Sequence, residues 1–360
     1  MKIKNTKRNL LYFLLGLIFL VAISTVVGYL FHLNNASSSE EPFRNVMLIG
    51  WDGVERERLY GLLSEFRLPN LQKIIDEGAI VNITVTTGRT DTKAGWSEIL
   101  TGYTATITGV HSNSDYKPIP KGYTIFERLE NRFGKENIVT IFLGGKINNI
   151  AARGPHKICV NCMTRDDRRE KTAWWDENTE APTKDGEPKI FEEREGEPYY
   201  YTKDSLDVFT IALNSSSNVG PRAIEYLERY KDERFFFFVH FEEPDETGHI
   251  YGGSSVQYAR DLIMDDDWLG EIVSKLKELG LYDETLIYVV TDHGFSQTVN
   301  GHYDHRYQPY IFMATNDGLF KGKSVKTEGD RKDITPTLLW RYGFKLDRIS
   351  PALDGIPFIR

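Results

Sequence analysis

Cysteine is nearly absent from this 360-residue chain, which has only Cys159 and Cys162, in the sequence C-V-N-C. Nothing else in that segment completes a four-ligand zinc ribbon. In an oxidising compartment a small local disulfide is the favoured state of two such cysteines, and half of a zinc site is the alternative.

Positively charged residues are fewer than negatively charged ones. The chain has 44 Lys and Arg residues against 52 Asp and Glu, a formal net charge of −8. The amino-terminal tail is basic, so the remainder is more acidic than this total. An acidic body does not suit the phosphate backbone of nucleic acids, and we expect no nucleic-acid partner. Internal repeats and long low-complexity tracts are lacking as well.

Charge is missing altogether between Leu10 and Phe31, a run long enough to cross a bilayer as a helix. Basic residues precede it within 1–9, which predicts that this tail stays cytoplasmic and the rest of the chain is exported. We therefore predict a cytoplasmic tail at 1–9, a transmembrane signal-anchor at 10–32, a polar linker at 33–43 and an extracytoplasmic domain at 44–360. This describes a single-pass membrane protein. A cleaved signal peptide is the alternative.

The exported part alternates apolar runs with amphipathic stretches, which predicts an α/β fold. The predicted strands are Val46–Gly50, Ile80–Val85, Ile138–Leu143, Phe235–Phe241, Leu286–Thr291 and Tyr310–Ala314. The predicted helices are Pro69–Glu77, Ala94–Leu100, Ile125–Phe133, Gly220–Tyr230, Val256–Leu279 and Ile334–Tyr342. Residues 155–205 break the pattern. They are rich in charge and include Trp174 and Trp175, so we predict an insertion that forms a cap or a substrate-side loop.

Carboxylates and histidines follow three of the predicted strands. Asp52 follows the first, Asp245 and His249 follow Phe235–Phe241, and Asp292 and His293 follow Leu286–Thr291. In open α/β sheets, ligands and metals bind at the carboxyl edge where such residues emerge. Carboxylate and imidazole together suit zinc. Taken singly, each fragment also fits an ordinary strand-end turn, and Asp52 fits a helix cap.

A late histidine completes the set of ligands, and both His302 and His305 are candidates. Six ligands without cysteine suit two divalent ions, Zn²⁺ or Mn²⁺, and paired cations commonly clamp a phosphoryl group. By contrast, we interpret His240 as a packed or hydrogen-bonded histidine. We interpret the acidic triplet at 265–267 as a solvated helix face with one inward carboxylate.

A hydroxyl nucleophile is available just before a predicted helix. Thr90 and Thr92 both precede the run that starts at Ala94. A hydroxyl at a helix amino terminus can meet a cation and a phosphate together, and coordination would activate it for attack. A simple helix cap is the alternative role for Thr92.

Together these fragments resemble the alkaline phosphatase superfamily, and within it the type I phosphodiesterase/nucleotide pyrophosphatase group, from about residue 45 to 358 with 155–205 unmatched. The resemblance implies a three-layer sandwich around a mostly parallel sheet. It also implies two metal sites, with zinc as the first choice of ion and manganese as the alternative. One has the ligands Asp52, Thr92, Asp292 and His293, and the other has Asp245, His249 and His305, with His302 as the alternative to His305.

The resemblance also selects the nucleophile. The family has glycines ten and seventeen residues after it and a phosphate-binding Asn twenty-one after it. Counting from Thr92 reaches Gly102, Gly109 and Asn113, whereas counting from Thr90 reaches Leu100, Ile107 and His111. The family's usual Phe-Pro-Asn after the nucleophile is replaced by Lys93-Ala94-Gly95. Lys93 either neutralises a phosphate oxygen or points to solvent. A sulfatase is disfavoured, because sulfatases need Cys or Ser at the nucleophile position.

We therefore predict a metal-dependent phosphodiesterase/nucleotide pyrophosphatase-like hydrolase that acts through a phospho-threonine at Thr92. Asn113 and Lys93 are the predicted phosphate-binding residues. The expected substrate is a small-molecule or lipid-headgroup phosphoester. The alternatives are a phosphoethanolamine-type transferase of the same superfamily, working at the membrane surface, and a non-catalytic exported binding protein that has kept the fold.

Overall fold

The computed structural model describes residues 43–162, 183, 186–296, 305, 307–322 and 329–359. The chain divides into two units, Met1–Pro42 and Phe43–Arg360, and all described residues belong to the second. Within these ranges no helix is both long and apolar enough to cross a membrane. The predicted signal-anchor at 10–32 lies outside the described residues, so membrane attachment and an extracytoplasmic location remain predictions.

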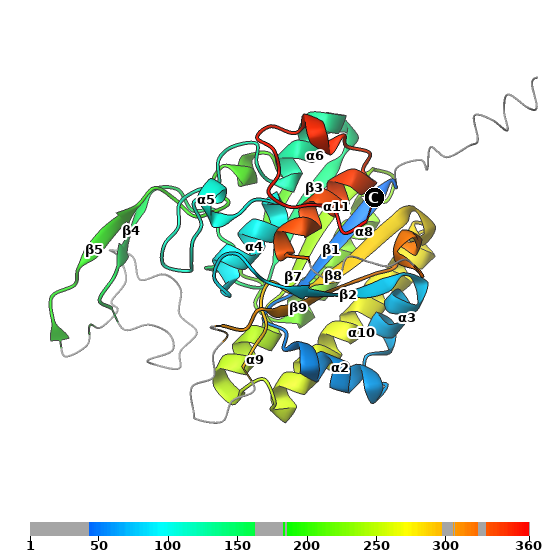
Figure 1. Ribbon diagram of the computed structural model, residues 1–360, viewed down its shortest axis with the longest axis horizontal. Coiled ribbons are helices and arrows are strands. Elements are labelled where there is room, and N and C mark those ends of the chain that lie inside the picture. The colour runs from blue at the N-terminus through cyan, green and yellow to red at the C-terminus, as the bar shows by residue number, and fades with distance from the viewer. Residues whose placement is uncertain are drawn as a thin grey trace, which may run out of the picture. The chain divides into compact units, whose positions relative to one another are not determined.

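A seven-stranded sheet forms the centre of the second unit (Figure 1). Its order is β2 (Ala79–Thr84), β9 (Tyr310–Thr315), β8 (Thr285–Val290), β1 (Asn45–Trp51), β7 (Phe235–Phe241), β3 (Val139–Gly144) and β6 (Val208–Thr210). From β8 to β6 all neighbours are parallel, whereas β9 is antiparallel to both β8 and β2. The predicted α/β fold with a mostly parallel sheet is confirmed.

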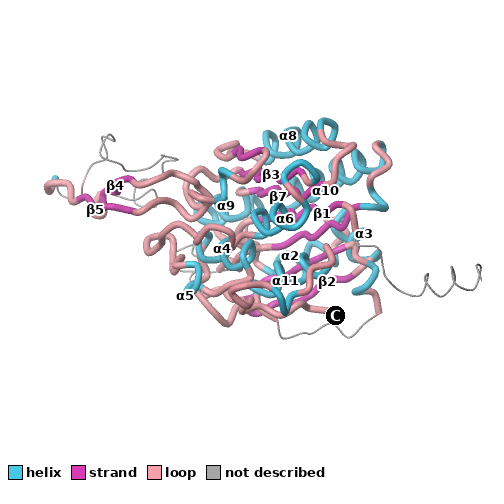
Figure 2. The backbone as a smooth tube through the Cα atoms, turned by 90° about the horizontal axis from the view of Figure 1, so that it is seen from above, coloured by secondary structure: helices cyan, strands magenta, loops and turns pink. Residues whose placement is uncertain are grey.

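Helices cover both faces of this sheet. Successive strand residues point to opposite sides, and because the strands carry apolar residues on both sides, each face has a core to cover. In β1, Val46 and Leu48 face one core and Met47 and Ile49 face the other. The first core is covered by α4 (Thr92–Thr101), α6 (Ile125–Phe133) and α11 (Ile334–Arg341). The second is covered by α2 (Arg56–Ser64), α3 (Pro69–Glu77), α8 (Ser216–Arg229) and α10 (Val256–Glu278). Figure 2 shows β3, β7 and β1 side by side within these layers.

All twelve predicted elements are present, with ends that differ by a few residues. Short elements were missed, namely α2, β6, α5 (Ala105–Thr108), α9 (Glu243–Tyr251) and the antiparallel pair β4 (His156–Cys159) and β5 (Phe191–Arg194). This pair lies within 155–205, where we expected little regular structure. Cys159 and Cys162 form the predicted disulfide. Trp174 and Trp175 lie outside the described residues.

The acidic triplet on α10 is not the predicted solvated face with one inward carboxylate. Asp265 and Asp266 are both buried, and only Asp267 is exposed. Asp266 accepts hydrogen bonds from the backbone N–H groups of Leu71 at 2.6 Å and Asn70 at 3.1 Å. The first N–H groups of a helix need such acceptors, and the residue that precedes α3 supplies none from its side chain. Asp266 therefore caps α3 from a distant part of the sequence.

Candidate active site

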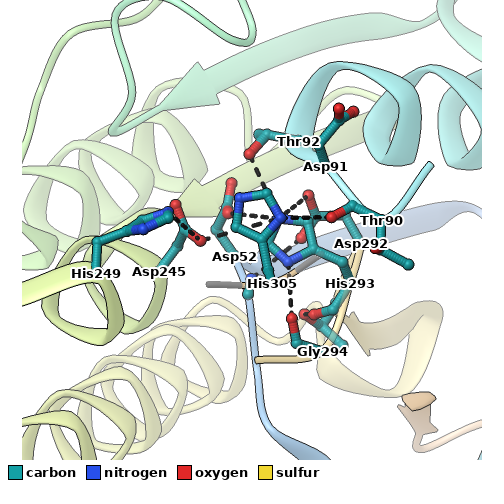
Figure 3. Close-up of polar contacts among 12 residues, drawn as sticks. Asp52, Thr90, Asp91, Thr92, Asp245, His249, Asp292, His293, Gly294 and His305 are labelled. Carbon is teal, nitrogen blue, oxygen red and sulfur yellow. Dashed lines mark hydrogen bonds and ion pairs between the residues drawn. The ribbon is translucent and has the colours of Figure 1, made fainter. Parts of the chain in front are cut away.

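The candidate residues converge at the carboxyl edge of the sheet, where three adjacent parallel strands end. Asp52 directly follows β1, and Asp292 and His293 come just after β8. β7 leads into α9, which carries Asp245 in its first turn and His249 one turn later. Figure 3 shows these side chains pointing toward one another, with Asp245 and His249 coming from α9. All of them are buried except His249, which is partly exposed.

Two overlapping groups of side chains have the geometry to hold a cation. Asp245, His249 and His305 form one group and Asp52, Asp245 and His293 form the other, and within each group the ligand atoms all lie within 4.8 Å of one another. Asp292 adjoins the second group, with its Oδ2 3.4 Å from His293 Nε2. His302 lies outside the described residues. Every predicted carboxylate or histidine ligand that the structure describes is therefore part of one cluster.

Thr92 lies beside this cluster, in the first turn of α4. Its Oγ1 is 3.5 Å from His293 Nε2, and the side chain is buried. Thr90 plays a different part, because its hydroxyl accepts the N–H of Tyr307 and its carbonyl accepts a hydrogen bond from His305 Nδ1. Between the two threonines, it is Thr92 that faces the ligands, while Thr90 holds the segment that carries His305.

Asn113 is held at the amino terminus of the same helix. Its Oδ1 accepts the backbone N–H of Lys93 at 2.9 Å, and its own N–H donates to Asp91 Oδ2 at 3.1 Å. Asp91 is the N-cap residue of α4. The side-chain amide of Asn113 thus lies next to the nucleophile although 21 residues separate them in sequence.

Gly95, which stands where the family has Asn, packs closely against Asp292. A Cβ atom at position 95 would lie 2.7 Å from the Cβ of Asp292 and 3.0 Å from its carbonyl oxygen. Contacts this short require a shift of the helix or of the strand end. The absence of a side chain therefore lets α4 approach the end of β8, which brings Thr92 close to Asp292 and His293.

The cluster contains three buried carboxylates, those of Asp52, Asp245 and Asp292. Burial raises the pKa of Asp292 well above its usual range, and the nearby charge of Asp52 adds to the effect. Burial also disfavours ionisation of Asp52, but the ammonium of Lys146 and the hydrogen bond and charge of His240 together outweigh it and lower the pKa of that carboxyl to about 2. Burial lowers the pKa of His305 to about 4, helped by His293. His305 is therefore neutral near pH 7 and has a lone pair to offer.

The donor set fits divalent ions such as Zn²⁺ or Mn²⁺. Asp245 Oδ1 and Asp292 Oδ2 are buried and accept no hydrogen bond from the described residues. The Nδ1 atoms of His293 and His305 are hydrogen-bonded to the backbone carbonyls of Gly294 and Thr90, which leaves each Nε2 free to act as a ligand. Unsatisfied carboxylate oxygens and oriented imidazoles are what a metal centre requires.

Lys146 was missed in the sequence and is central in the structure. Its Nζ lies 2.9 Å from Asp52 Oδ1, 2.6 Å from Asp245 Oδ2 and 3.2 Å from Thr92 Oγ1. A signal for it existed, because Gly144-Gly145-Lys146 follows a predicted strand that ends at the same edge of the sheet. A protonated lysine does not ligate a metal ion, so a pattern of metal ligands does not include it.

His240 is hydrogen-bonded, in agreement with its interpretation from the sequence, and its partner is Asp52. The His240 Nε2 atom lies 2.7 Å from Asp52 Oδ2, and Trp96 Nε1 donates to the same oxygen at 3.2 Å. Both partners engage one carboxylate oxygen, and so direct Oδ1 toward Lys146 and His293. His240 and Trp96 therefore orient a candidate metal ligand.

Lys93 does not point to solvent, which was one of its two predicted alternatives. Its side chain is buried and forms an ion pair with Glu197, and its Nζ lies 4.1 Å from the centre of the Tyr116 ring. Glu197 also accepts a hydrogen bond from the Tyr116 hydroxyl at 2.8 Å. The residue after the nucleophile is thus tied to the chain that follows β5. Its predicted contact with a phosphate oxygen remains a prediction.

Comparison with known proteins gives the same assignment as the motifs. The family model for type I phosphodiesterase / nucleotide pyrophosphatase matches residues 46–336. The bis(5'-adenosyl)-triphosphatase enpp4 of Mus musculus is 27% identical over 273 residues, which are 76% of this chain and 50% of the mouse protein. Its Homo sapiens counterpart is 24% identical over 279 residues, covering 77% and 53%. The chain thus spans about half the length of these curated relatives.

Among solved structures, BT4656 in complex with its substrate D-glucosamine-2-N,6-O-disulfate is similar to this chain with a TM-score of 0.53. The sequence identity is 13%, and the match covers 88% of this chain and 79% of the other. At such low identity the likeness concerns the fold alone. It agrees with the α/β architecture described above.

Proposed function

Because the chain belongs to the type I phosphodiesterase / nucleotide pyrophosphatase family, we propose that it is a metal-dependent phosphodiesterase with Thr92 as its nucleophile. Homologues in this family hydrolyse phosphoester and pyrophosphate bonds. One observation carries the proposal for this chain. The Thr92 hydroxyl is at the amino terminus of a helix, 3.5 Å from His293 and beside two groups of metal-ligating side chains.

Two divalent ions fit the ligands in the proposed arrangement. One would be held by Asp52, Thr92, Asp292 and His293, and the other by Asp245, His249 and His305. When bound, such ions supply positive charge to the phosphoryl oxygens and favour the ionised form of a coordinated hydroxyl. Zn²⁺ is our first choice, because the ligands combine carboxylates with neutral imidazoles.

Thr92 then carries the phosphoryl group between two displacement steps. In the first, its Oγ1 loses a proton to solvent and forms a bond to phosphorus, while the bond from phosphorus to the leaving oxygen breaks. The leaving oxygen takes a proton from water. In the second step, water attacks the phospho-threonine, releases the product phosphate or phosphomonoester, and restores the Thr92 hydroxyl.

The amino terminus of α4 provides the binding site for the phosphoryl oxygens. The dipole of the helix favours an anion there. The Oδ1 atom of Asn113 is occupied by the backbone N–H of Lys93, so its side-chain nitrogen is available to donate to a phosphoryl oxygen. In this proposal the side-chain amide of Asn113 binds a phosphoryl oxygen. The neighbouring Lys93 contributes positive charge toward the phosphate.

Metal removal tests the proposal. The purified protein is stripped with a chelator and assayed on bis(p-nitrophenyl) phosphate and on diadenosine triphosphate, before and after addition of Zn²⁺ or Mn²⁺. We expect activity to disappear with the metal and return with it, and Asp292→Asn to lack the recovery. Asp267→Asn, at an exposed position on α10, is the matched control. Full turnover by the stripped protein contradicts the proposal, and so does recovery by Asp292→Asn that equals recovery by the control.

A further inference from the structure

We propose that Lys146 is a built-in cation that competes with one of the two divalent ions, so that the ions bind with unequal affinity and in a fixed order. The ion on Asp245, His249 and His305 binds first, and the ion beside Thr92 binds second. This inference rests on the proposed function, because it concerns the same metal site. It assigns to Lys146 a role that the ligand pattern alone does not contain.

The ammonium of Lys146 takes the place of a cation between three oxygens. Its distances to Asp52 Oδ1, Asp245 Oδ2 and Thr92 Oγ1 are 2.9, 2.6 and 3.2 Å. An ammonium has three donors, and here each one has an acceptor. These acceptors come from the end of β1, from α9 and from α4. Lys146 thus connects the nucleophile to carboxylates of both candidate ion sites.

Lys146 affects the two sites differently. On Asp245 it uses Oδ2, while Oδ1 accepts no hydrogen bond from the part of the chain that the structure describes and lies 3.5 Å from His249 Nε2. An ion bound by Asp245 Oδ1, His249 and His305 therefore leaves Lys146 in place. The ion beside Thr92 needs Asp52 and Thr92 as ligands, and both are already hydrogen-bonded to the ammonium of Lys146. The second ion must break these contacts, which weakens its binding.

The backbone around Lys146 keeps its side chain in this position. The N–H of Gly145 donates to the carbonyl of His240 at 3.0 Å, and the carbonyl of Lys146 accepts the N–H of Ala212 at 3.1 Å. A Cβ atom at Gly145 would lie 2.7 Å from the carbonyl oxygen of Asn214. The chain after β3 is therefore fixed next to β7, with Lys146 buried at 4% exposure. Because these contacts are made by the backbone, a substitution of the lysine side chain leaves them intact.

Calorimetric titration of the chelator-stripped protein with Zn²⁺ tests the inference. For the wild type we expect two ions, the second at least about tenfold weaker than the first. In Lys146→Met the competing charge is gone, so the second ion should bind at least about tenfold more tightly than in the wild type, with the first nearly unchanged. His249→Ala is the matched variant, and it should lose the tight ion and keep the weak one. Equal affinities in the wild type, or an unchanged second affinity in Lys146→Met, overturn the inference.

A second measurement covers the case in which stripped Lys146→Met does not fold, since it leaves Asp52 and Asp245 without their counter-ion. The variant is then purified with Zn²⁺ bound, and ion release to an excess of chelator is followed. We expect slower release of the second ion than from the wild type, whereas equal release rates overturn the inference. The proposed function fails separately, if the wild type binds no divalent ion or shows no metal-dependent turnover.

Discussion

The ammonium of Lys93 and the carboxylate of Glu197 form an ion pair whose side chains are 3% and 0% exposed. Burial lowers the pKa of Lys93, and the charge of Glu197 opposes this effect. For Glu197, burial raises the pKa, but Lys93 and the hydrogen bonds to that carboxylate outweigh it and the net shift is downward. The first turn of the nucleophile helix is thus linked to the segment after β5 by two charges that depend on each other.

We expect Lys93→Met to lower the free energy of unfolding by about 3–5 kcal/mol, because it leaves the buried Glu197 carboxylate without its counter-charge. Urea unfolding measures this change. Lys121→Met, at an exposed position, is the control and should stay within about 0.5 kcal/mol of the wild type. Adding Glu197→Gln to Lys93→Met should restore part of the loss. Purely additive effects of the two substitutions would show that the pair is not coupled.

Gly95→Ala should impair both stability and metal binding, because the new methyl group would overlap the Asp292 side chain. We expect a loss of about 1–3 kcal/mol in urea unfolding and weaker Zn²⁺ binding in calorimetry. Gly61→Ala, in α2, has no atom within 4 Å of the added carbon. That control should instead be stabilised by about 0.5–1 kcal/mol. If the two alanine variants bind Zn²⁺ alike, the close approach of α4 to Asp292 is not needed.

His240→Leu should weaken Zn²⁺ binding about 10- to 100-fold, because Asp52 loses the N–H group that orients its carboxylate. The affinity is measured by competition with a coloured chelator. His111→Gln, an exposed histidine, is the control and should bind as the wild type does. An unchanged affinity in His240→Leu would mean that Asp52 is oriented well enough by Trp96 alone.

Asp266 makes a pH-dependent contribution to stability. Burial raises its pKa to about 6, partly offset by hydrogen bonds from Leu71 and Asn70. A raised carboxyl pKa means that the folded state favours the protonated form. The stabilisation is therefore complete below the ordinary pKa of 3.8 and is lost as the pH rises through about 6.

The difference in unfolding free energy between the wild type and Asp266→Asn should accordingly fall by about 2–3 kcal/mol between pH 4 and pH 7. Urea unfolding at several pH values gives this difference directly. Asp267→Asn, the exposed neighbour, should show no such trend. A constant difference for Asp266→Asn across the range would place the pKa of Asp266 near its ordinary value.

The strand Phe235–Phe241 was predictable from a short continuous apolar run, and the helix Pro69–Glu77 from apolar residues that follow the helical period. Both signals lie within the segment itself. The α9 helix was not predictable from its own sequence. It begins Glu243-Pro244-Asp245, includes Gly248 and has few apolar residues. Its fold depends on the strand before it. Asp266 shows the same limit, because its role as a cap depends on α3, about 195 residues away.

The candidate site was predictable at residues whose side chains are themselves metal ligands. Asp52, Asp292 and His293 stand just after apolar strands, and Asp245 and His249 lie a few residues after another. Parallel strands bring their ends together. Lys146, His240 and Glu197 act only through a partner that is distant in sequence. Nothing near Lys93 in the chain indicates that its counter-ion is Glu197, so only the folded structure shows it.

The most direct test of the account is the metal-dependent turnover of bis(p-nitrophenyl) phosphate by Thr92→Ala and Thr92→Ser, with each variant loaded with Zn²⁺ to the same extent as the wild type. If Thr92 carries the phosphoryl group, the alanine variant should lose at least about a thousandfold in kcat, while serine keeps measurable turnover because it retains a hydroxyl. Full metal-dependent turnover by Thr92→Ala would contradict the assignment of Thr92 as the nucleophile.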